Sequence, residues 1–250
     1  MQQTVCITGA SSGFGKCTAE LFLKNNWKVI AIARRLEPLN ELKSFAQNDD
    51  QLLIHSLDVQ NEKEVTSFFQ SLPAEFKQID VLFNNAGLSR GKDELINAKL
   101  DHWEEMIDTN IKGFLYVAKA VLSIMKEQGS GYIINTGSVA GRNSYVGGNV
   151  YGATKAAVKM LSESMRLEAA AYGVRVGEIA PGAAETEFSM VRFDQNKSTA
   201  DSVYTGFTPL VGEDIANTVW FLANLPEHVC IQELVIMPTA QPNANVVYRK

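Results

Sequence analysis

Seven short apolar segments alternate with longer segments of helical composition, and this alternation limits the possible folds most strongly. The strand-like segments are TVCITG, KVIAIA, QLLIHSL, DVLFNNAG, GYIINTGS, VRVGEIAPG and CIQELVIM. They are apolar nearly throughout rather than at every second position, which is typical of parallel strands that helices cover on both faces. We therefore expect one doubly wound α/β domain over residues 1–250, with a parallel sheet of about seven strands.

The stretch from about residue 186 to residue 212 is the least regular part of the chain. It is polar, shows weak periodicity and follows the sixth strand-like segment. An insertion at that point lies above the carboxyl edge of the sheet, where folds of this kind bind ligands. This segment is therefore predicted to form a substrate lid.

Charge and cysteine usage exclude several classes of function. The net charge is −5 and there is no run of basic residues, which argues against nucleic acid as the main partner. The three cysteines and three histidines are widely scattered, so neither a disulfide framework nor a metal site is expected. Without a leader-like segment or an apolar stretch of about 18 residues, the cytoplasm is the expected location and a membrane is not an expected partner.

A glycine-rich segment, TGASSGFG, follows the first predicted strand directly. Glycines permit positive φ and allow a phosphate to approach the backbone closely. The following helix start offers free N–H groups and a partial positive charge to a pyrophosphate. A tight strand-to-helix turn is the simpler alternative, but the position after the first strand favours a dinucleotide site at Gly9, Ala10, Ser11, Ser12, Gly13, Phe14 and Gly15.

The second predicted strand ends in Ala33, Arg34 and Arg35, where an acidic residue would bind a ribose 2′-hydroxyl. Arginine instead makes charge-assisted bonds to a 2′-phosphate, so the sequence predicts NADP rather than NAD. The ends of the third and fourth strands complete the expected cofactor contacts, at Asp58, Val59, Asn85, Ala86 and Gly87.

Tyr151 and Lys155 are four positions apart in a segment of helical composition, so their side chains are neighbours. Taken alone, such a pair is more typical of a solvated surface. Beside the glycine motif and Ser138, it indicates proton transfer. A tyrosine with a pKa near ~10 is a poor base, and a nearby ammonium is expected to lower that pKa. Ser138 ends the fifth predicted strand and could hydrogen-bond a substrate oxygen.

The ordered set of motifs resembles the short-chain dehydrogenase/reductase family over essentially the whole chain. The motifs are Thr8-Gly9-x-x-x-Gly13-x-Gly15, Asn84-Asn85-Ala86-Gly87, Asn110, Ser138, Tyr151-x-x-x-Lys155 and Pro181-Gly182 with Thr186. The segments GGNVYGATKA, TEFSMVRF and VWFLANLPEHVCIQELVIMPTAQ are similar to its NADP-dependent serine 3-dehydrogenase/3-hydroxy acid dehydrogenase branch. Two departures are Phe14, which also occurs in this branch, and Glu178, which is expected to stay outside the chemistry.

The resemblance implies a Rossmann fold, NADP as cofactor and a homotetramer. It implies that Lys155 binds the nicotinamide ribose and that Asn110 helps to hold a water in a proton relay. Pro181, Gly182 and Thr186 would contact the nicotinamide side.

The branch implies oxidation at C3 of a small 3-hydroxy acid such as serine, allo-threonine or 3-hydroxyisobutyrate, and reduction of carbonyls such as malonic semialdehyde. A carboxylate needs a cation, for which Arg192 is the first candidate and Arg142 or Arg90 the second; a salt bridge or subunit contact would explain these arginines equally well. Gly148, in the GGN segment, would leave room for the substrate. A reductase of a sugar, ketoacyl thioester or diketone, and a non-catalytic NADP sensor, remain alternatives.

Overall fold

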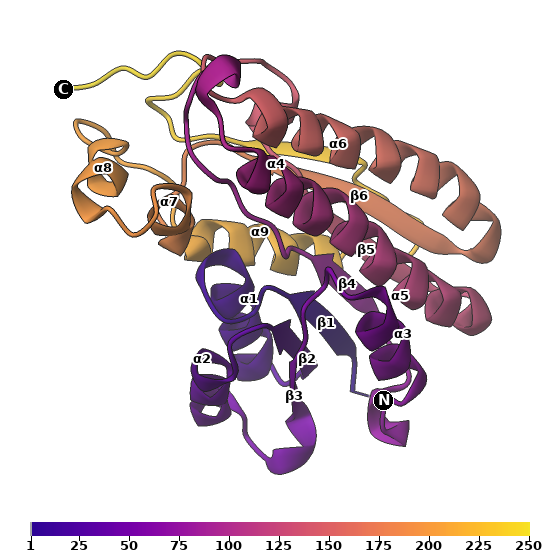
Figure 1. The fold of residues 1–250 in the computed structure, drawn as a ribbon. Helices are drawn as coiled ribbons and strands as arrows, with labels where there is room; N and C mark the ends of the chain where they lie inside the picture. Colours follow the sequence, from indigo (N-terminus) through magenta and orange to yellow (C-terminus); the bar gives the residue numbers. More distant parts are fainter. Residues whose placement is uncertain (1) are drawn as a thin grey trace.

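The computed structural model describes residues 2–250 and contains one seven-stranded parallel sheet (Figure 1). The strand order is β3-β2-β1-β4-β5-β6-β7, so the chain winds outward from β1 in one direction and then from β4 in the other. This confirms the predicted doubly wound α/β fold. The strands are β1 (Thr4–Thr8), β2 (Lys28–Ala33), β3 (Leu52–Ser56), β4 (Val81–Asn84), β5 (Gly131–Thr136), β6 (Val174–Pro181) and β7 (Glu233–Ile236).

Helices cover both faces of the sheet (Figure 1). The α-helices are α1 (Gly13–Lys24), α2 (Leu36–Asn40), α3 (Glu62–Gln70), α4 (Leu100–Ile107), α5 (Phe114–Gln128), α6 (Asn149–Ala169), α7 (Glu187–Arg192), α8 (Lys197–Ser202) and α9 (Gly212–Ala223). Short 3₁₀ turns are η1 (Glu41–Phe45), η2 (Asp49–Gln51), η3 (Ala74–Phe76), η4 (Leu95–Asn97), η6 (Val139–Gly141) and η7 (Ala170–Tyr172). No helix within residues 2–250 has the length and apolar composition that crossing a bilayer requires.

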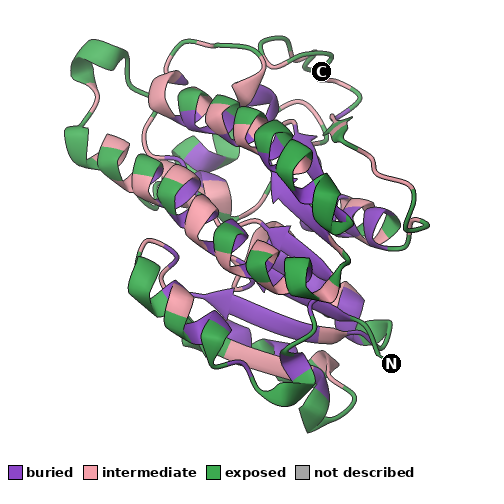
Figure 2. Cartoon of the chain, turned by 90° about the vertical axis from the view of Figure 1, so that its right-hand side faces the viewer, coloured by how far each residue is buried: buried purple, intermediate pink, exposed green. Residues whose placement is uncertain are grey.

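Two hydrophobic cores explain why the central strands are apolar at nearly every position. Alternate residues of β1, such as Val5 and Cys6, point to opposite faces of the sheet. The Cys6 side packs with residues of α3, α5 and α6, whereas the Val5 side packs with residues of α1 and α9. In Figure 2 the central strands are mostly buried, and the helices expose their outer faces. Both faces of a strand must therefore be apolar.

The two edge strands depart from this pattern. The last residues of β3, His55 and Ser56, are exposed, and β7 alternates between exposed and half-buried positions. β7 spans four residues, so the segment CIQELVIM is extended only in its second half. An edge strand has a neighbour on one side alone, and fewer helices cover it. Continuous apolar composition is consequently a signal of central strands more than of edges.

One wide helical turn separates α4 from α5. Residues Asp108–Gly113 form a π-helical turn, η5, and Asn110 lies within it. Turns of this kind are rare and often occur at functional sites. The Asn110 side chain accepts a hydrogen bond from Leu88 N (2.9 Å) and donates to Leu88 O (2.8 Å) and Thr154 Oγ1 (3.1 Å). The turn thus ties the loop after β4 to α6.

The segment from residue 186 to residue 212 forms two short helices and a connecting loop beyond the carboxyl end of the sheet. α7 and α8 lie beside the C-terminal segment at one end of the molecule (Figure 1). Lys250 N donates to Gly206 O at 2.8 Å, and Glu185 N donates to Leu210 O at 2.8 Å. The hydroxyl of Tyr204 donates to Ala184 O at 2.7 Å. These bonds attach the segment to the end of β6 and to the C-terminus.

Candidate active site

A cavity of about 690 Å³ lies at the carboxyl end of the central strands. It brings together most of the residues predicted for the cofactor, along with Ser138 and Arg192. The predicted cofactor residues in its lining are Gly9, Ser11, Ser12, Gly13, Phe14, Arg34, Arg35, Asp58, Val59, Asn85, Ala86, Gly87, Tyr151, Lys155, Pro181, Gly182 and Thr186.

The glycine loop turns sharply between β1 and α1. Gly9 has φ of +69° and Gly13 has φ of +49°, values that a side chain disfavours. A Cβ on Gly15 would lie 2.3 Å from Gly9 O, so the loop closes on itself only with glycine there. The N-cap residue Ser12 makes no side-chain cap bond, and the first turn of α1 holds no acidic residue. The first N–H groups of α1 therefore face the cavity side without a carboxylate to satisfy them.

The loop after β4 is fixed by Thr8 at the end of β1. Its hydroxyl oxygen accepts from Asn85 N and Ala86 N, each at 2.9 Å. The Asn85 amide donates to Thr8 O at 3.0 Å, and the Thr136 hydroxyl donates to Asn85 Oδ1 at 3.3 Å. The ends of β1, β4 and β5 are thereby locked together at the floor of the cavity.

The three expected reactive side chains meet in this cavity. Tyr151 and Lys155 are buried on α6, and Ser138 is buried directly after β5. The Lys155 ammonium donates to Thr136 O at 2.7 Å. A Cβ on Gly87 would lie 3.1 Å from Asn110 Oδ1 and 3.4 Å from Lys155 Nζ, so both groups approach the same glycine.

The pKa of Tyr151 departs from the expectation that its lysine neighbour lowers it. Burial raises the pKa of Tyr151 to about 12 in the chain alone, against the opposing effects of a hydrogen bond with Ser138 and the positive charge of Arg192. Burial also lowers the pKa of Lys155 to about 8. The physical reason is desolvation, which penalises both the phenolate and the ammonium. The expected phenolate–ammonium pair thus needs further positive charge or polar contacts beside Tyr151.

Four predicted site residues do not line the cavity. Ala10 is fully buried and its N–H bonds to Ile32 O, and Gly15 is packed on the backbone of Gly9. Asn110 is held behind Lys155 by its bonds to Leu88 and Thr154. A Cβ on Gly148 would lie 2.6 Å from the Tyr145 ring, so this glycine makes room for a tyrosine rather than directly for a ligand. These positions support the lining from behind.

The two arginines after β2, Arg34 and Arg35, are half-exposed and line the cavity near the glycine loop. Arg35 Nη2 lies 2.7 Å from Glu187 Oε2 and donates to Ser11 Oγ at 3.4 Å. Arg34 Nη1 lies 3.8 Å from Glu105 Oε1. Exposed ion pairs of this kind are weak, so an incoming phosphate can replace them at little cost.

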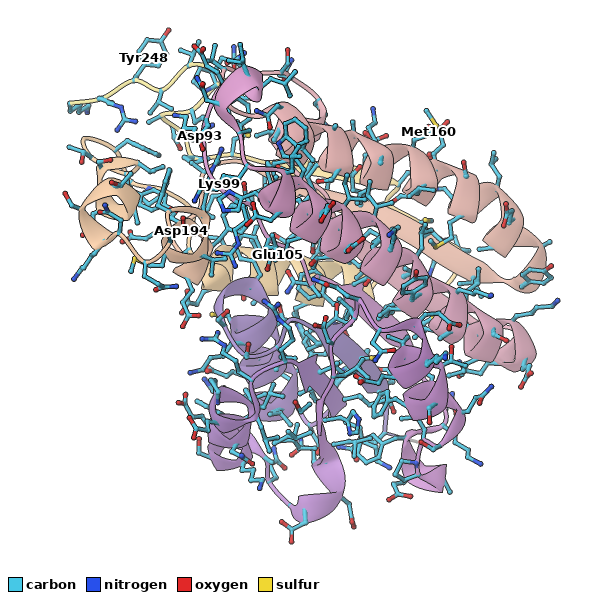
Figure 3. All side chains as sticks on the ribbon, in the orientation of Figure 1. Asp93, Lys99, Glu105, Met160, Asp194 and Tyr248 are labelled. Carbon is cyan, nitrogen blue, oxygen red and sulfur yellow. The ribbon has the colours of Figure 1, made fainter. Side chains whose placement is uncertain are left out.

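The three arginines considered for a substrate carboxylate differ in their partners. Arg142 is bound to Glu178 and Glu233, and it is not among the lining residues. Arg90 is bound to Glu105 on α4 and to Asp194 after α7, both labelled in Figure 3.

Arg192 has no carboxylate partner among residues 2–250. Its Nε donates to Gly91 O at 2.9 Å and its Nη2 to the Tyr145 hydroxyl at 3.2 Å. Its guanidinium carbon lies 5.9 Å from the centre of the Tyr151 ring.

Several lining residues were not predicted from the sequence. Tyr145 and Lys92 come from loops, Tyr204 follows α8, and Gln241 and Arg249 come from the C-terminal segment. Gln241 is buried, and its side-chain oxygen accepts from Ala183 N at 2.7 Å. The polar composition after the seventh strand is the only signal of this role. Nothing local in the sequence shows that the C-terminal segment returns to the cavity.

Lys155→Met is expected to stabilise the folded protein at neutral pH. The pKa of Lys155 falls from 10.5 to about 8 on folding, so the unfolded chain binds more protons between these values. The stability contributed by this group therefore rises as pH increases from 8 to 10.5. Below pH 8 the folded state bears the full free-energy cost of burying the Lys155 ammonium. Urea unfolding should show a gain of roughly 3 kcal/mol at pH 7 that shrinks toward pH 10.5.

The matched control is Lys159→Met, one helical turn further along α6. Its side chain is 39% exposed. The unfolding free energy of this control should change little, and its difference from the wild type should not vary with pH in this way. Equal stabilities of the Lys155→Met variant and the wild type at pH 7 would contradict a buried, destabilising ammonium.

Comparison with known proteins identifies the family of this chain. The sequence model of the short chain dehydrogenase family matches residues 3–197. The NADP-dependent 3-hydroxy acid dehydrogenase YdfG of Escherichia coli is 45% identical over 243 residues, covering 97% of both chains. Sulfoacetaldehyde reductase 2 of Chromohalobacter salexigens is 42% identical, covering 96% of both chains.

Among solved structures, the closed form of a serine dehydrogenase complexed with NADP⁺ superposes with a TM-score of 0.93. It is 44% identical and covers 99% of this chain and 100% of its own. The family match and these identities agree with the geometry of the cavity. The chain therefore belongs to the short-chain dehydrogenase family.

Proposed function

We propose that the protein is an NADP-dependent oxidoreductase that oxidises the C3 hydroxyl of small 3-hydroxy acids such as serine, allo-threonine and 3-hydroxyisobutyrate. In the opposite direction it would reduce carbonyls such as malonic semialdehyde. The names of the relatives at 45% and 44% identity support this reaction class. The observation that carries the proposal is Arg192, a cation that has no carboxylate partner within residues 2–250 and lies beside the buried Tyr151.

The lining residues fit a dinucleotide with a 2′-phosphate. The uncapped start of α1 and the glycine loop suit a pyrophosphate, since helix N-termini favour anions. Arg34 and Arg35 stand where an acidic residue would favour NAD, and the side chains of both are more than half exposed in their ion pairs. A bound nicotinamide cofactor would supply the hydride acceptor or donor for the reaction.

Side chains of the protein itself would transfer the proton of the substrate hydroxyl. In oxidation, Tyr151 would take the proton of the substrate hydroxyl as C3 is oxidised. Ser138 would hydrogen-bond the substrate oxygen, and Lys155 would stabilise the phenolate form. The pKa of Tyr151, raised by burial to about 12, means that positive charge from Lys155, Arg192 and the oxidised cofactor would have to favour the phenolate. Asn110 is proposed to hold the water of the relay from behind Lys155.

Arg192→Leu is expected to lower kcat/KM for a 3-hydroxy acid by about 10- to 100-fold. The reason is the loss of a charge-assisted hydrogen bond to the carboxylate, worth about 1.5–3 kcal/mol. The methyl ester of the same hydroxy acid lacks this charge and serves as the matched substrate. Initial rates with both substrates measure the effect.

In this variant, kcat/KM should fall far less for the ester than for the acid. A decrease of equal size for acid and ester would show that Arg192 shapes the pocket without binding the carboxylate. No turnover of any 3-hydroxy acid by the wild type would end the substrate proposal itself.

A short sulfonate aldehyde is the second candidate substrate, supported by the relative at 42% identity. A guanidinium binds a sulfonate and a carboxylate by similar hydrogen bonds. A panel with NADPH that holds malonic semialdehyde, sulfoacetaldehyde, a sugar, a ketoacyl thioester and a diketone separates these possibilities. Binding of NADPH without turnover of any of them would favour the sensor alternative.

The lid, the assembly and the location are also proposals. Residues 186–212 would close over the substrate, supported by the lining positions Phe188 and Tyr204. A homotetramer is supported by exposed apolar side chains on α4 and α6, among them Met160, which points away from the body in Figure 3. A cytoplasmic location is supported by the three unpaired cysteines. Light scattering at a monomeric mass, or recovery outside the cytoplasmic fraction, would contradict the last two.

A further inference from the structure

A buried carboxylate lies directly beneath the segment that carries Ser138. Glu178 is on β6, opposite Asn135 of β5, and is 1% exposed. A Cβ on Gly137 would lie 1.6 Å from Glu178 Oε1, which no arrangement of these atoms allows. The carboxylate therefore packs against the backbone between Thr136 and Ser138, and only glycine at position 137 leaves room for it.

Arg142 holds this carboxylate through two parallel hydrogen bonds. Its Nη1 donates to Glu178 Oε1 and its Nη2 to Glu178 Oε2, both at 3.0 Å. Ser138 caps the 3₁₀ turn η6 at its start and Arg142 caps it at its end. The contact with Gly137 and the bonds from Arg142 thus fix the backbone on both sides of Ser138. Because the pair between Arg142 and Glu178 is bidentate, it fixes the orientation of the two side chains as well as their distance.

The same short segment supports Lys155. Its ammonium donates to Thr136 O, one residue before Gly137. A Cβ on Gly141 would lie 2.5 Å from the carbonyl carbon of Lys155, so the turn also packs on the backbone of α6. Burial lowers the pKa of Lys155, and the negative charge of Glu178 acts in the opposite direction.

We propose that Glu178, held by Arg142, is a positioning residue: it fixes the segment that presents Ser138, and its negative charge supports the ammonium of Lys155. The role rests on the proposed hydride-transfer function. The charged groups of this region are Lys155 and Lys159 on α6, Glu178 on β6, Glu233 on β7 and Arg142 after η6. Arg142 also donates to Glu233 at 2.9 Å, and Lys159 lies 3.7 Å from Glu233.

Glu178→Gln tests the charge with little change in volume. We expect kcat to fall roughly 10-fold at pH 7.5 with a smaller change in KM, because an opposite charge nearby moves a pKa by 1–3 and the ammonium acts in the reaction step. Glu178→Asp keeps the charge and should restore much of the rate. Glu233→Gln is the matched control, since it removes a more exposed carboxylate from the same arginine and should leave kcat within about 2-fold.

A second measurement needs neither substrate nor cofactor. The titration of Lys155 is followed by NMR of ¹³Cε-labelled lysine, with its signal assigned by its absence in Lys155→Met. In Glu178→Gln this lysine should lose its proton at lower pH than in the wild type. Glu178→Asp and Glu233→Gln should titrate like the wild type. Failure of the 3-hydroxy acid proposal would leave this result unaffected.

Arg142→Lys separates the effect of the bidentate geometry from the effect of the charge at position 142. It is also the alternative test if Glu178→Gln does not fold. A lysine keeps the positive charge but cannot form the two parallel bonds. We expect a lower kcat with an unchanged Lys155 titration. The proposal is overturned if Glu178→Gln titrates at Lys155 like the wild type, if Glu233→Gln shows the same loss, or if Arg142→Lys has wild-type kcat.

Discussion

Tyr151→Phe is expected to lower kcat by roughly 10³-fold while the dissociation constant for NADPH changes by less than about 2-fold. The substitution removes one oxygen from a buried ring, so the packing against Phe188, at 5.6 Å between ring centres, is kept. The lost oxygen is the only group on this side chain that can exchange a proton with the substrate. Turnover of malonic semialdehyde and calorimetric titration with NADPH measure the two quantities.

The matched control is Tyr172→Phe, which makes the same chemical change on a tyrosine that is not among the lining residues. It should have wild-type kcat. Unchanged turnover in Tyr151→Phe would remove this residue from the mechanism. A large parallel loss of NADPH binding would instead indicate that the hydroxyl holds the site together.

The double variant Arg34→Ala with Arg35→Ala is expected to lower the ratio of kcat/KM for NADP over NAD by about 10²- to 10⁴-fold. Each hydrogen bond from a guanidinium to the 2′-phosphate contributes about 1.5–3 kcal/mol. Glu105 and Glu187, the present partners of these arginines, would remain and face the phosphate with negative charge. Rates with both cofactors at saturating substrate measure the ratio.

NAD is the internal control in this experiment. Its kcat/KM should stay level or rise, because NAD has no 2′-phosphate to lose contacts. The two single variants show how the preference divides between the arginines. Equal losses with NADP and NAD would mean that Arg34 and Arg35 support the fold of the β2–α2 connection without reading the phosphate.

The central strands could be predicted because each must be apolar on both faces. The same rule was weaker at β7, which is short and half-exposed at the edge. The segment EPLNELKSFAQ has helical composition but forms the five-residue α2 followed by a 3₁₀ turn. Local composition cannot show where a helix must stop to let β3 reach the sheet.

The meeting of the glycine loop with the ends of β2, β3 and β4 in one cavity could also be predicted, because strand ends of a parallel sheet lie at one edge. Contacts between residues far apart in the chain could not be predicted in this way. The sequence did not reveal that Glu178 binds Arg142 and contacts Gly137. The raised pKa of Tyr151 depends on burial by residues from several elements, which spacing along α6 does not reveal.

The π-helical turn at Asp108–Gly113 makes chain length itself a determinant of the site. An α-helix advances by about 100° per residue, and a π turn accommodates an additional residue within one turn. Deleting one residue there would let an α-helix run through, and α4 and α5 would keep their rotational relation. The buried face of α5, with Val117 and Val121, would stay on the sheet, but the wide turn would be lost and Asn110 would move away from Leu88. In this stretch a single deletion should therefore impair the site more than the fold.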